Sequence, residues 1–422
     1  MAFHSLTRYL KPLAAAGVAF CIAAASLAAP TASLAQRSRS QITLTEEDYW
    51  SFTSISNAIN SLIKEYEQTH PNVTISRTVV PGTLLLSKYL AQSATNSLPS
   101  ILMPDNPMIQ ELAQANVLAP LDKQVKAWGQ WSDYFAASQQ ATMYNQHIYG
   151  VHMGTNDLGL IYNTDLFKAA GITHPPATWA ELLTDAPKLT HGSTYAMTFV
   201  GGQNECSVWQ FEPWLWTAGG DLQSLNTPGA VSALTLWTTL VKNKWASPSV
   251  VTWCQNDTEQ QFVLGRAAIQ EDGPWNLPDL LSHKSLHWAM APIPVPKAGM
   301  KPVVPVGGEV WAVGRTDPAQ EAAAWDFIKW SQQPSVLTKY DAALGYIPVR
   351  KELAAQAAKQ NPYLKVFVDE LAQARPRTTY LGANYPKASD ALFTVIQQAL
   401  TFKQTPAAAL DHAASEVKTL TK

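Results

Sequence analysis

The feature that most constrains the fold is a regular alternation of strand and helix patterns over residues 42–150. The segment "ITL" has the pattern of a short strand, and apolar residues then recur at helical spacing until Pro71 ends the helix. "VTISRTVV" alternates as a strand does, and helix patterns over 84–93 and 108–115 flank the apolar "SILMP". Strands that alternate with helices form βαβ units, so the sequence predicts an α/β fold with a largely parallel sheet.

The same alternation resumes in the second half of the chain, where helix starts are well marked. Thr178 and Glu181 have the spacing of a capping box. Thr227 and Asp317 each stand at an N-cap position directly before a proline, which suits the first helical position. From Lys351 onward the patterns are helical. A chain of 422 residues is too long for one ordinary core, so we expect two lobes.

The N-terminus has the pattern of an export signal. Arg8 and Lys11 precede an alanine-rich apolar run, and "SLA" at residues 33–35 matches a cleavage site. The run falls just short of the roughly 20 apolar residues that a membrane span needs. Cys21 follows Phe20 rather than a small residue, which argues against lipid attachment. We therefore expect residues 1–35 to be a cleaved signal peptide and the mature protein to be exported, periplasmic or extracellular.

Charge and motifs exclude several functions. The formal net charge is −2 and no long basic run occurs, so nothing supports nucleic-acid binding. Common hydrolase, phosphate-loop and zinc motifs are absent, and we predict neither an enzyme nor a cofactor or metal site. His283 and His287 have i, i+4 spacing, which we interpret as a solvated pair. Cys206 and Cys254 remain in the mature chain, and in an oxidising compartment they predict a disulfide.

Aromatic residues beside turns are the strongest indication of function. The chain has 15 Trp and 14 Tyr, and Trp50, Trp209, Trp275 and Trp311 each stand near carboxylates or turn glycines. For each tryptophan taken alone, packing in the core is the favoured interpretation. As a set, aromatic faces rimmed by acceptors indicate a site for a polyhydroxylated ligand, because a sugar packs its C–H face on a ring and donates its hydroxyls. In "AAIQEDGPW", Trp275 follows the carboxyl end of a predicted strand, where α/β sheets bind ligands.

Five segments, in order, resemble the extracellular solute-binding proteins of carbohydrate ABC importers, the class of maltose-binding protein. They are "LIYNTDLFKAAGITHPPATWAEL", "FVLGRAAIQEDGPW", "PVVPVGGEVWAV", "AAWDFIKWSQQPSVLTKYDAALGYIPVRKEL" and "ALTFKQTPAAALDHAASEV". The resemblance covers nearly the whole mature chain. It implies a two-lobe periplasmic-binding-protein fold with the ligand cleft between the lobes.

The resemblance also implies lobe boundaries and crossing points. The N-lobe should hold residues 41–154 and 309–344, and the C-lobe residues 158–305 and 347–422. The chain should cross near Gly154–Leu158, Val304–Glu309 and Leu344–Ile347.

Individual positions carry over as expected ligand contacts. Trp275 matches the stacking tryptophan of the class, and Gly307 and Gly308 match a glycine pair where the backbone approaches the ligand. Asn156 stands where maltose-binding protein has a ligand-contacting Glu, which argues against maltose itself. The other expected contacts are Asp48, Trp50, Asp105, Trp209, Trp311 and Tyr385.

The sequence therefore predicts a monomeric binding protein that captures a sugar, an oligosaccharide in our interpretation, by hinge closure and delivers it to a membrane permease. Two alternatives stay open. A phosphorylated polyol would need cations, for which Arg266, Arg350 and Arg377 are candidates. A glycosidase would need paired carboxylates such as those of "TEEDYW" and "QEDGPW".

Overall fold

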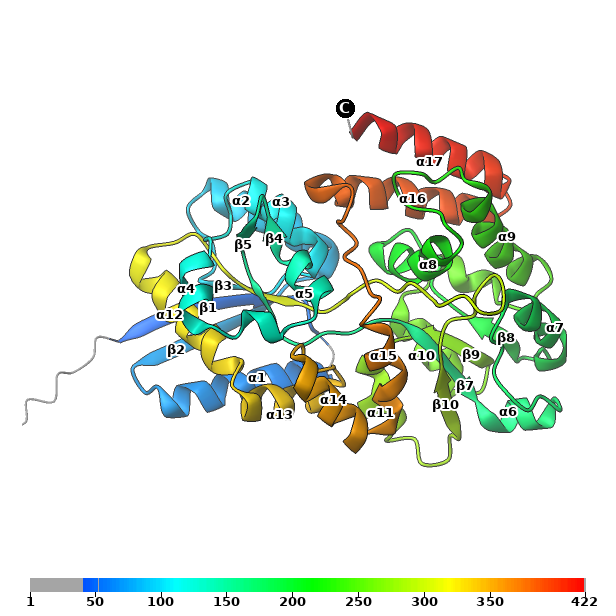
Figure 1. Cartoon of the computed structure of the whole chain (residues 1–422), viewed down its shortest axis with the longest axis horizontal. Coiled ribbons are helices and arrows are strands. Elements are labelled where there is room, and N and C mark those ends of the chain that lie inside the picture. The colour runs from blue at the N-terminus through cyan, green and yellow to red at the C-terminus, as the bar shows by residue number, and fades with distance from the viewer. Residues whose placement is uncertain (1–40, 52, 421–422) are drawn as a thin grey trace, which may run out of the picture. The chain divides into compact units, whose positions relative to one another are not determined.

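The computed structural model describes residues 41–51 and 53–420, so the predicted signal peptide lies outside the described residues. The first sheet has the strand order β2-β1-β3-β11-β6 and the second the order β10-β7-β9-β8 (Figure 1). The strands of the first sheet are β1 (Ile42–Asp48), β2 (Val73–Val79), β3 (Ile101–Leu102), β6 (Val151–His152) and β11 (Val310–Val313). Those of the second are β7 (Gly159–Asn163), β8 (Tyr195–Thr198), β9 (Ala267–Asp272) and β10 (Trp288–Ala291).

Helices surround the first sheet and form what we call the first lobe. Its longest helix, α1, runs over Thr53–Thr69, and the predicted apolar face is buried: Ile59, Leu62 and Tyr66 are each at most 3% exposed. This face packs with β1 and with α12 and α13 in one core, because apolar residues at helical spacing share one side of the helix. The other helices are α2 (Gly82–Ala94), α3 (Ile109–Gln114), α4 (Asp122–Trp128), α5 (Ala136–Ala141), α12 (Pro318–Ser331) and α13 (Pro334–Leu344). The short hairpin β4 (Met143–Tyr144) and β5 (His147–Ile148) follows α5.

The second sheet has its own core and forms the second lobe. Trp214 and Trp237 are fully buried there among apolar residues of the surrounding helices. Those helices are α6 (Thr164–Ala169), α7 (Trp179–Leu189), α8 (Glu205–Thr217), α9 (Pro228–Lys242), α10 (Gln255–Val263), α11 (Leu277–Leu280), α16 (Tyr385–Leu400) and α17 (Pro406–Leu420). Helices α14 (Lys351–Gln360) and α15 (Lys365–Glu370) lie between α13 and α16 in the chain. Two separate cores confirm the expectation of two lobes, while the exact boundaries stay a prediction.

Local signals at helix starts are confirmed. Thr178 and Glu181 form the capping box of α7. The Thr227 side chain accepts from the N–H of Ala230, and that of Asp317 accepts from two N–H groups of α12. These caps are set by residues within one helical turn, which is why the sequence alone predicts them.

The expectation of largely parallel sheets is wrong in part. β1 pairs in parallel with β2 and β3, as βαβ units require, but β11 is antiparallel to both β3 and β6. In the second sheet only β8 and β9 are parallel. Parallel neighbours need a crossover connection, which is usually a helix. β7, β10 and β11 instead connect directly to segments that pass between the lobes.

Three segments pass between the lobes, and they pair with one another. They lie between β6 and β7, between β10 and β11, and after α13 (Figure 1). Thr155 of the first and Ile347 of the third exchange backbone hydrogen bonds of 2.8 and 2.9 Å. Asn156 of the first and Gly307 of the second exchange bonds of 2.8 and 3.3 Å. The predicted crossing points are thus hydrogen-bonded neighbours.

Candidate ligand-binding site at the crossing segments

Gly307 brings the second crossing segment against two predicted site residues. A Cβ at this position would lie 2.1 Å from Asn156 Oδ1 and 2.5 Å from Trp209 Cη2. Gly308 has φ +108°, and its Cβ would lie 2.6 Å from the carbonyl oxygen of Gly154. Only glycine allows both the close approach and this backbone conformation. The predicted glycine pair therefore allows the Asn156 amide, the Trp209 ring and the backbone of Gly154 to lie close to the second crossing segment.

Trp275 lies beside this group, at the end of β9 as predicted. Its ring folds over Gly273, where a Cβ would lie 2.0 Å from the ring. Its ring centroid is 6.5 Å from that of Trp209. The Asp272 carboxylate anchors the turn by accepting from Gly273 N at 2.9 Å and Asn276 Nδ2 at 2.6 Å. Burial raises the pKa of Asp272 to about 7, although these hydrogen bonds favour its ionised form.

The side chain of Trp275 is half-buried and contacts both main cores. A residue that packs against both lobes lies where they meet, so its contacts depend on how the lobes are placed. This position is consistent with the predicted stacking role, and that role stays a prediction.

Arg377 links the two lobes beside Trp209. Its Nη2 donates to Asp105 Oδ1 at 2.6 Å and its Nη1 to Glu205 Oε1 at 2.7 Å. Its guanidinium lies over the Trp209 ring, 4.6 Å from the centroid. Asp105 belongs to the first lobe and Glu205 begins α8 of the second, while the Arg377 side chain is only 3% exposed. A buried, charge-assisted bridge thus spans the predicted site.

Two hydroxyl groups of α16 extend this bridge. Tyr385 donates to Glu205 Oε1 at 2.7 Å and to Glu212 Oε1 at 3.2 Å, and the Ser389 hydroxyl donates to Glu205 Oε2. Burial raises the pKa of Glu205 and raises that of Glu212 well above its usual range. We call this group the Arg377 cluster; its members are Asp105, Glu205, Trp209, Glu212, Arg377, Tyr385 and Ser389.

Glu309 is a second buried carboxylate at the crossing segments. It accepts hydrogen bonds from the hydroxyls of Tyr49, which follows β1, and Tyr346, on the third crossing. Burial raises the pKa of Glu309 to about 7, the two hydroxyls oppose that rise, and Asp105 adds to it. Sequence reasoning missed Glu309, and its position directly after the glycine pair was the available signal.

Three predicted contacts lie elsewhere. Trp311 is fully buried in the first-lobe core, with its ring edge-on to Phe327, and its expected ligand contact stays a prediction. Asp48 is buried too, and its carboxylate accepts from Arg77 Nη2 at 2.9 Å and from Trp50 N at 2.6 Å. Trp50 is 9% exposed and packs in the same core as Trp311. Alternation along β11 places Trp311 and Val313 in one core and Val310 and Ala312 in another, so both faces of this strand are buried.

The arginines proposed for an anionic ligand do not converge. Arg266 is exposed at the start of β9, and Arg350 pairs with Asp133 at 3.0 Å. Arg377 alone lies in the cluster, where carboxylates already bind it.

Cys206 and Cys254 are free thiols in the structure, and they are neighbours. A hydrogen bond between the two side chains lowers the pKa of Cys254 to about 7. Asn204 Nδ2 also lies 3.5 Å from Cys254 Sγ. The disulfide stays a prediction that this proximity permits.

The remaining candidates carry no site. His283 pairs with Asp279 and His287 with Asp165, all partly exposed, and α11 ends before both histidines. Within the described ranges, no three metal-ligating side chains gather. Nor does any helix described over 41–420 have the length and apolarity to cross a membrane.

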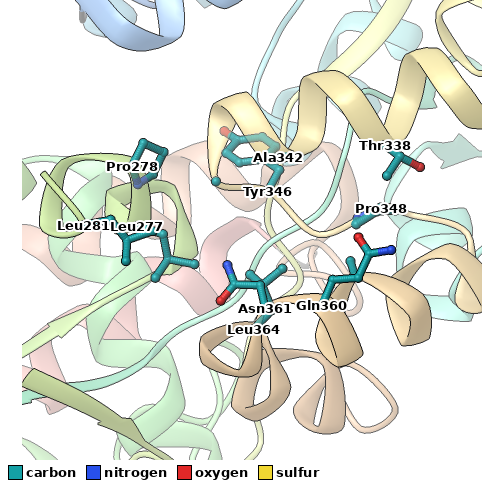
Figure 2. Close-up of a pocket in the computed structure, with 12 residues that line it drawn as sticks. Leu277, Pro278, Leu281, Thr338, Ala342, Tyr346, Pro348, Gln360, Asn361 and Leu364 are labelled. Atoms are coloured by element: carbon teal, nitrogen blue, oxygen red, sulfur yellow. The ribbon is translucent and has the colours of Figure 1, made fainter.

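A small cavity is lined by none of the predicted contacts. It measures about 180 Å³ and is bordered by α11, α13, α14 and the third crossing segment (Figure 2). Its lining is mostly apolar, with Leu277, Leu281, Pro348 and Leu364 among the wall residues. Binding sites for small molecules usually measure about 300–1,000 Å³. This cavity is therefore too small and too apolar for an oligosaccharide.

Over residues 61–366 the chain matches the family of bacterial extracellular solute-binding proteins. The chain belongs to this family. Among curated relatives, a putative binding protein of Brucella abortus is 24% identical, with 85% of this chain and 88% of the relative aligned. A maltotriose-binding protein of Pyrococcus abyssi is 22% identical over 80% of this chain and 74% of its own length.

Solved structures share the two-lobe fold. A solute-binding protein of Thermotoga lettingae bound to α-D-tagatose has a TM-score of 0.83 at 22% identity, covering 90% of this chain and all of its own. A maltose-bound protein of T. maritima has a TM-score of 0.80 at 24% identity with the same coverage. A Mycobacterium tuberculosis protein in complex with glycerophosphocholine has a TM-score of 0.78 at 19% identity, covering 90% and 98%.

The family and these relatives are binding proteins, so this solute-binding protein is not an enzyme, as predicted. The carboxylates that the glycosidase alternative would have used lie in different sheets. Glu46, Glu47 and Asp48 lie in β1 of one sheet, whereas Glu271 and Asp272 lie in β9 of the other.

Proposed function

We propose that this solute-binding protein captures a sugar of oligosaccharide size between its lobes and delivers it to the permease of an ABC importer. The observation that carries the proposal is the meeting of two tryptophan rings, of which Trp275 is half-buried, with amide and carboxylate groups where the crossing segments pair. Trp209 and Trp275 come from the second lobe, and Asn156 and Gly307 from crossing segments. Sugars need both kinds of group, because their rings have apolar faces and hydroxyl rims.

Hinge closure is the proposed mechanism. Asp105 of the first lobe and Glu205 of the second already meet through Arg377, so a ligand held at this place would contact both lobes. Such a ligand favours the closed state by its differential affinity for that state. The relatives that bind tagatose, maltose and maltotriose support a sugar as the solute.

A phosphorylated polyol is the second candidate, favoured by the similarity to the glycerophosphocholine complex. A thermal-shift screen tests both. The mature protein is heated with mono- and oligosaccharides and with glycerol 3-phosphate, because a ligand that binds only the folded state raises the melting temperature. Calorimetry then gives the affinity of each hit. A screen in which no sugar raises the melting temperature, and glycerol 3-phosphate does, would reject the sugar proposal.

A further inference from the structure

The Arg377 cluster sets a charge balance at the proposed site. Its cation is Arg377, and its carboxylates are Asp105, Glu205 and Glu212. The guanidinium donates to two of them at 2.6 and 2.7 Å, so its charge is already matched. Even if burial keeps Glu205 and Glu212 both protonated, Asp105 balances Arg377. The cluster therefore has no net positive charge in any of these protonation states.

Two polar atoms of the cluster are buried without a hydrogen-bond partner among the described residues. They are Nε of Arg377, a donor, and Oε2 of Glu212, an acceptor when ionised. Arg377 is 6% exposed and Glu212 fully buried. A hydroxyl group both accepts and donates, so it can satisfy groups of both kinds. An ionised phosphate oxygen only accepts, and a phosphate brings about −1.5 to −2 charges into a cluster whose one cation, Arg377, is already paired.

Burial increases the free-energy cost of placing an anion at this cluster. An anion that finds no free cation in a water-poor site loses its hydration without compensation, and it is screened less than at the surface. An uncharged sugar meets no such penalty, and its ring can pack on the half-buried Trp275.

We infer that Arg377, held by Asp105 and Glu205, makes the site select an uncharged polyhydroxylated ligand over its phosphorylated counterpart. The inference rests on the proposed ligand site and deepens it by naming the charge class of the solute. Asp105 and Glu205 are the specificity-determining residues, because they neutralise an arginine that would otherwise bind phosphate.

The first test uses inorganic phosphate and needs no knowledge of the sugar. Melting is compared in phosphate and in chloride at equal ionic strength, for the wild type and for the double variant Asp105→Asn/Glu205→Gln. The wild type should show no phosphate-specific shift. The double variant leaves Arg377 without its two carboxylate partners, so phosphate should raise its melting temperature and bind at least tenfold more tightly than to the wild type. A phosphate-specific shift in the wild type, or none in the folded double variant, would overturn the inference.

A matched control separates the cluster from any freed arginine. Asp133→Asn releases Arg350, which donates to Asp133 at 3.0 Å and is not a member of the cluster. Its phosphate response should stay well below that of the double variant, and an equal response would contradict the assignment. Circular dichroism checks folding, and the single variant Asp105→Asn replaces the double variant if the latter does not fold.

The second test compares matched ligands on the wild type. Calorimetry is run with glucose and glucose 6-phosphate, trehalose and trehalose 6-phosphate, and glycerol and glycerol 3-phosphate. Wherever binding is measurable, the uncharged ligand should bind at least tenfold more tightly than its phosphorylated counterpart. Equal affinity, or tighter binding of the phosphorylated ligand, would refute charge selection. If the phosphate test gives the expected result while no sugar in the wider screen binds, the sugar proposal fails and the inference about charge stands.

Discussion

The rings of Trp209 and Trp275 lie 6.5 Å apart and are inclined by 43°, although one belongs to α8 and the other to the turn after β9. Trp209 is 6% exposed and has Arg377 over its face, whereas Trp275 is half-buried and touches both lobes. The two tryptophans therefore differ in what they can offer. Trp209 is committed to the Arg377 cluster, and Trp275 is the ring with surface left for a ligand.

Trp275→Ala should lose at least a tenfold factor in sugar affinity, equivalent to about 1.5–4 kcal/mol, because it removes the stacking face. Stability of the ligand-free protein should fall less than the roughly 3–5 kcal/mol expected for a fully buried tryptophan. Calorimetry with a sugar from the screen and unfolding of the ligand-free variant measure the two effects. Trp237→Ala is the matched control: this ring is fully buried in the second-lobe core, so it should cost stability and leave affinity unchanged. An unchanged affinity in folded Trp275→Ala would remove this residue from the site.

Gly307→Ala should weaken binding at least tenfold and destabilise the protein by about 1–3 kcal/mol. The added methyl would lie 2.1 Å from Asn156 Oδ1 and 2.5 Å from the Trp209 ring, so both side chains must move. Gly82→Ala serves as the comparison, since its Cβ would meet Tyr49 at an ordinary 3.6 Å. Denaturant unfolding and calorimetry on both variants give the result, and equal behaviour of the two would show that the close approach at Gly307 is dispensable.

Glu309 should make stability depend on pH. Burial raises its pKa to about 7 in the folded state, above its ordinary value near 4.5. Between these values the folded state holds the proton more often than the unfolded state does, so this group's contribution falls as pH rises from about 4.5 to about 7. Unfolding free energies of the wild type and Glu309→Gln should therefore differ by an amount that changes across this range and is constant above it. A difference that stays constant from pH 4.5 to 8 would contradict the raised pKa.

Cys206 and Cys254 should form a disulfide in protein recovered from an oxidising compartment, because their thiols are already hydrogen-bond neighbours. Alkylation under denaturing, non-reducing conditions should label neither cysteine, and labelling after reduction should find both. Mass spectrometry counts the labels. Two labels before reduction would show that the free thiols of the structure are the state of the mature protein.

Local signals explain which features the sequence could predict. The capping box of α7 and the apolar face of α1 depend on residues within a few turns of each other, and both are present as predicted. The position of Trp275 after β9 was likewise readable from a strand followed by Gly-Pro.

The Arg377 cluster could not be predicted in the same way. It joins Asp105, Glu205 and Arg377, which meet only once both lobes and the crossing segments are in place. Glu309 meets Tyr49 and Tyr346 for the same reason. Nothing in the spacing of these residues along the chain encodes such contacts, and the Gly-Gly pair beside Trp311 did not reveal that both faces of β11 are buried.

The place of β11 in the first sheet sets the order in which the two sheets can be completed during synthesis. This strand, Val310–Val313, lies between β3 and β6, two strands that emerge from the ribosome long before it. Until Val313 has been translated, no strand connects β3 to β6, so the first sheet is incomplete. All four strands of the second sheet have been translated once β10 is complete. The second sheet can therefore have all its strands while the first still lacks β11, although the core of the second lobe is completed only when α16 and α17 have been made.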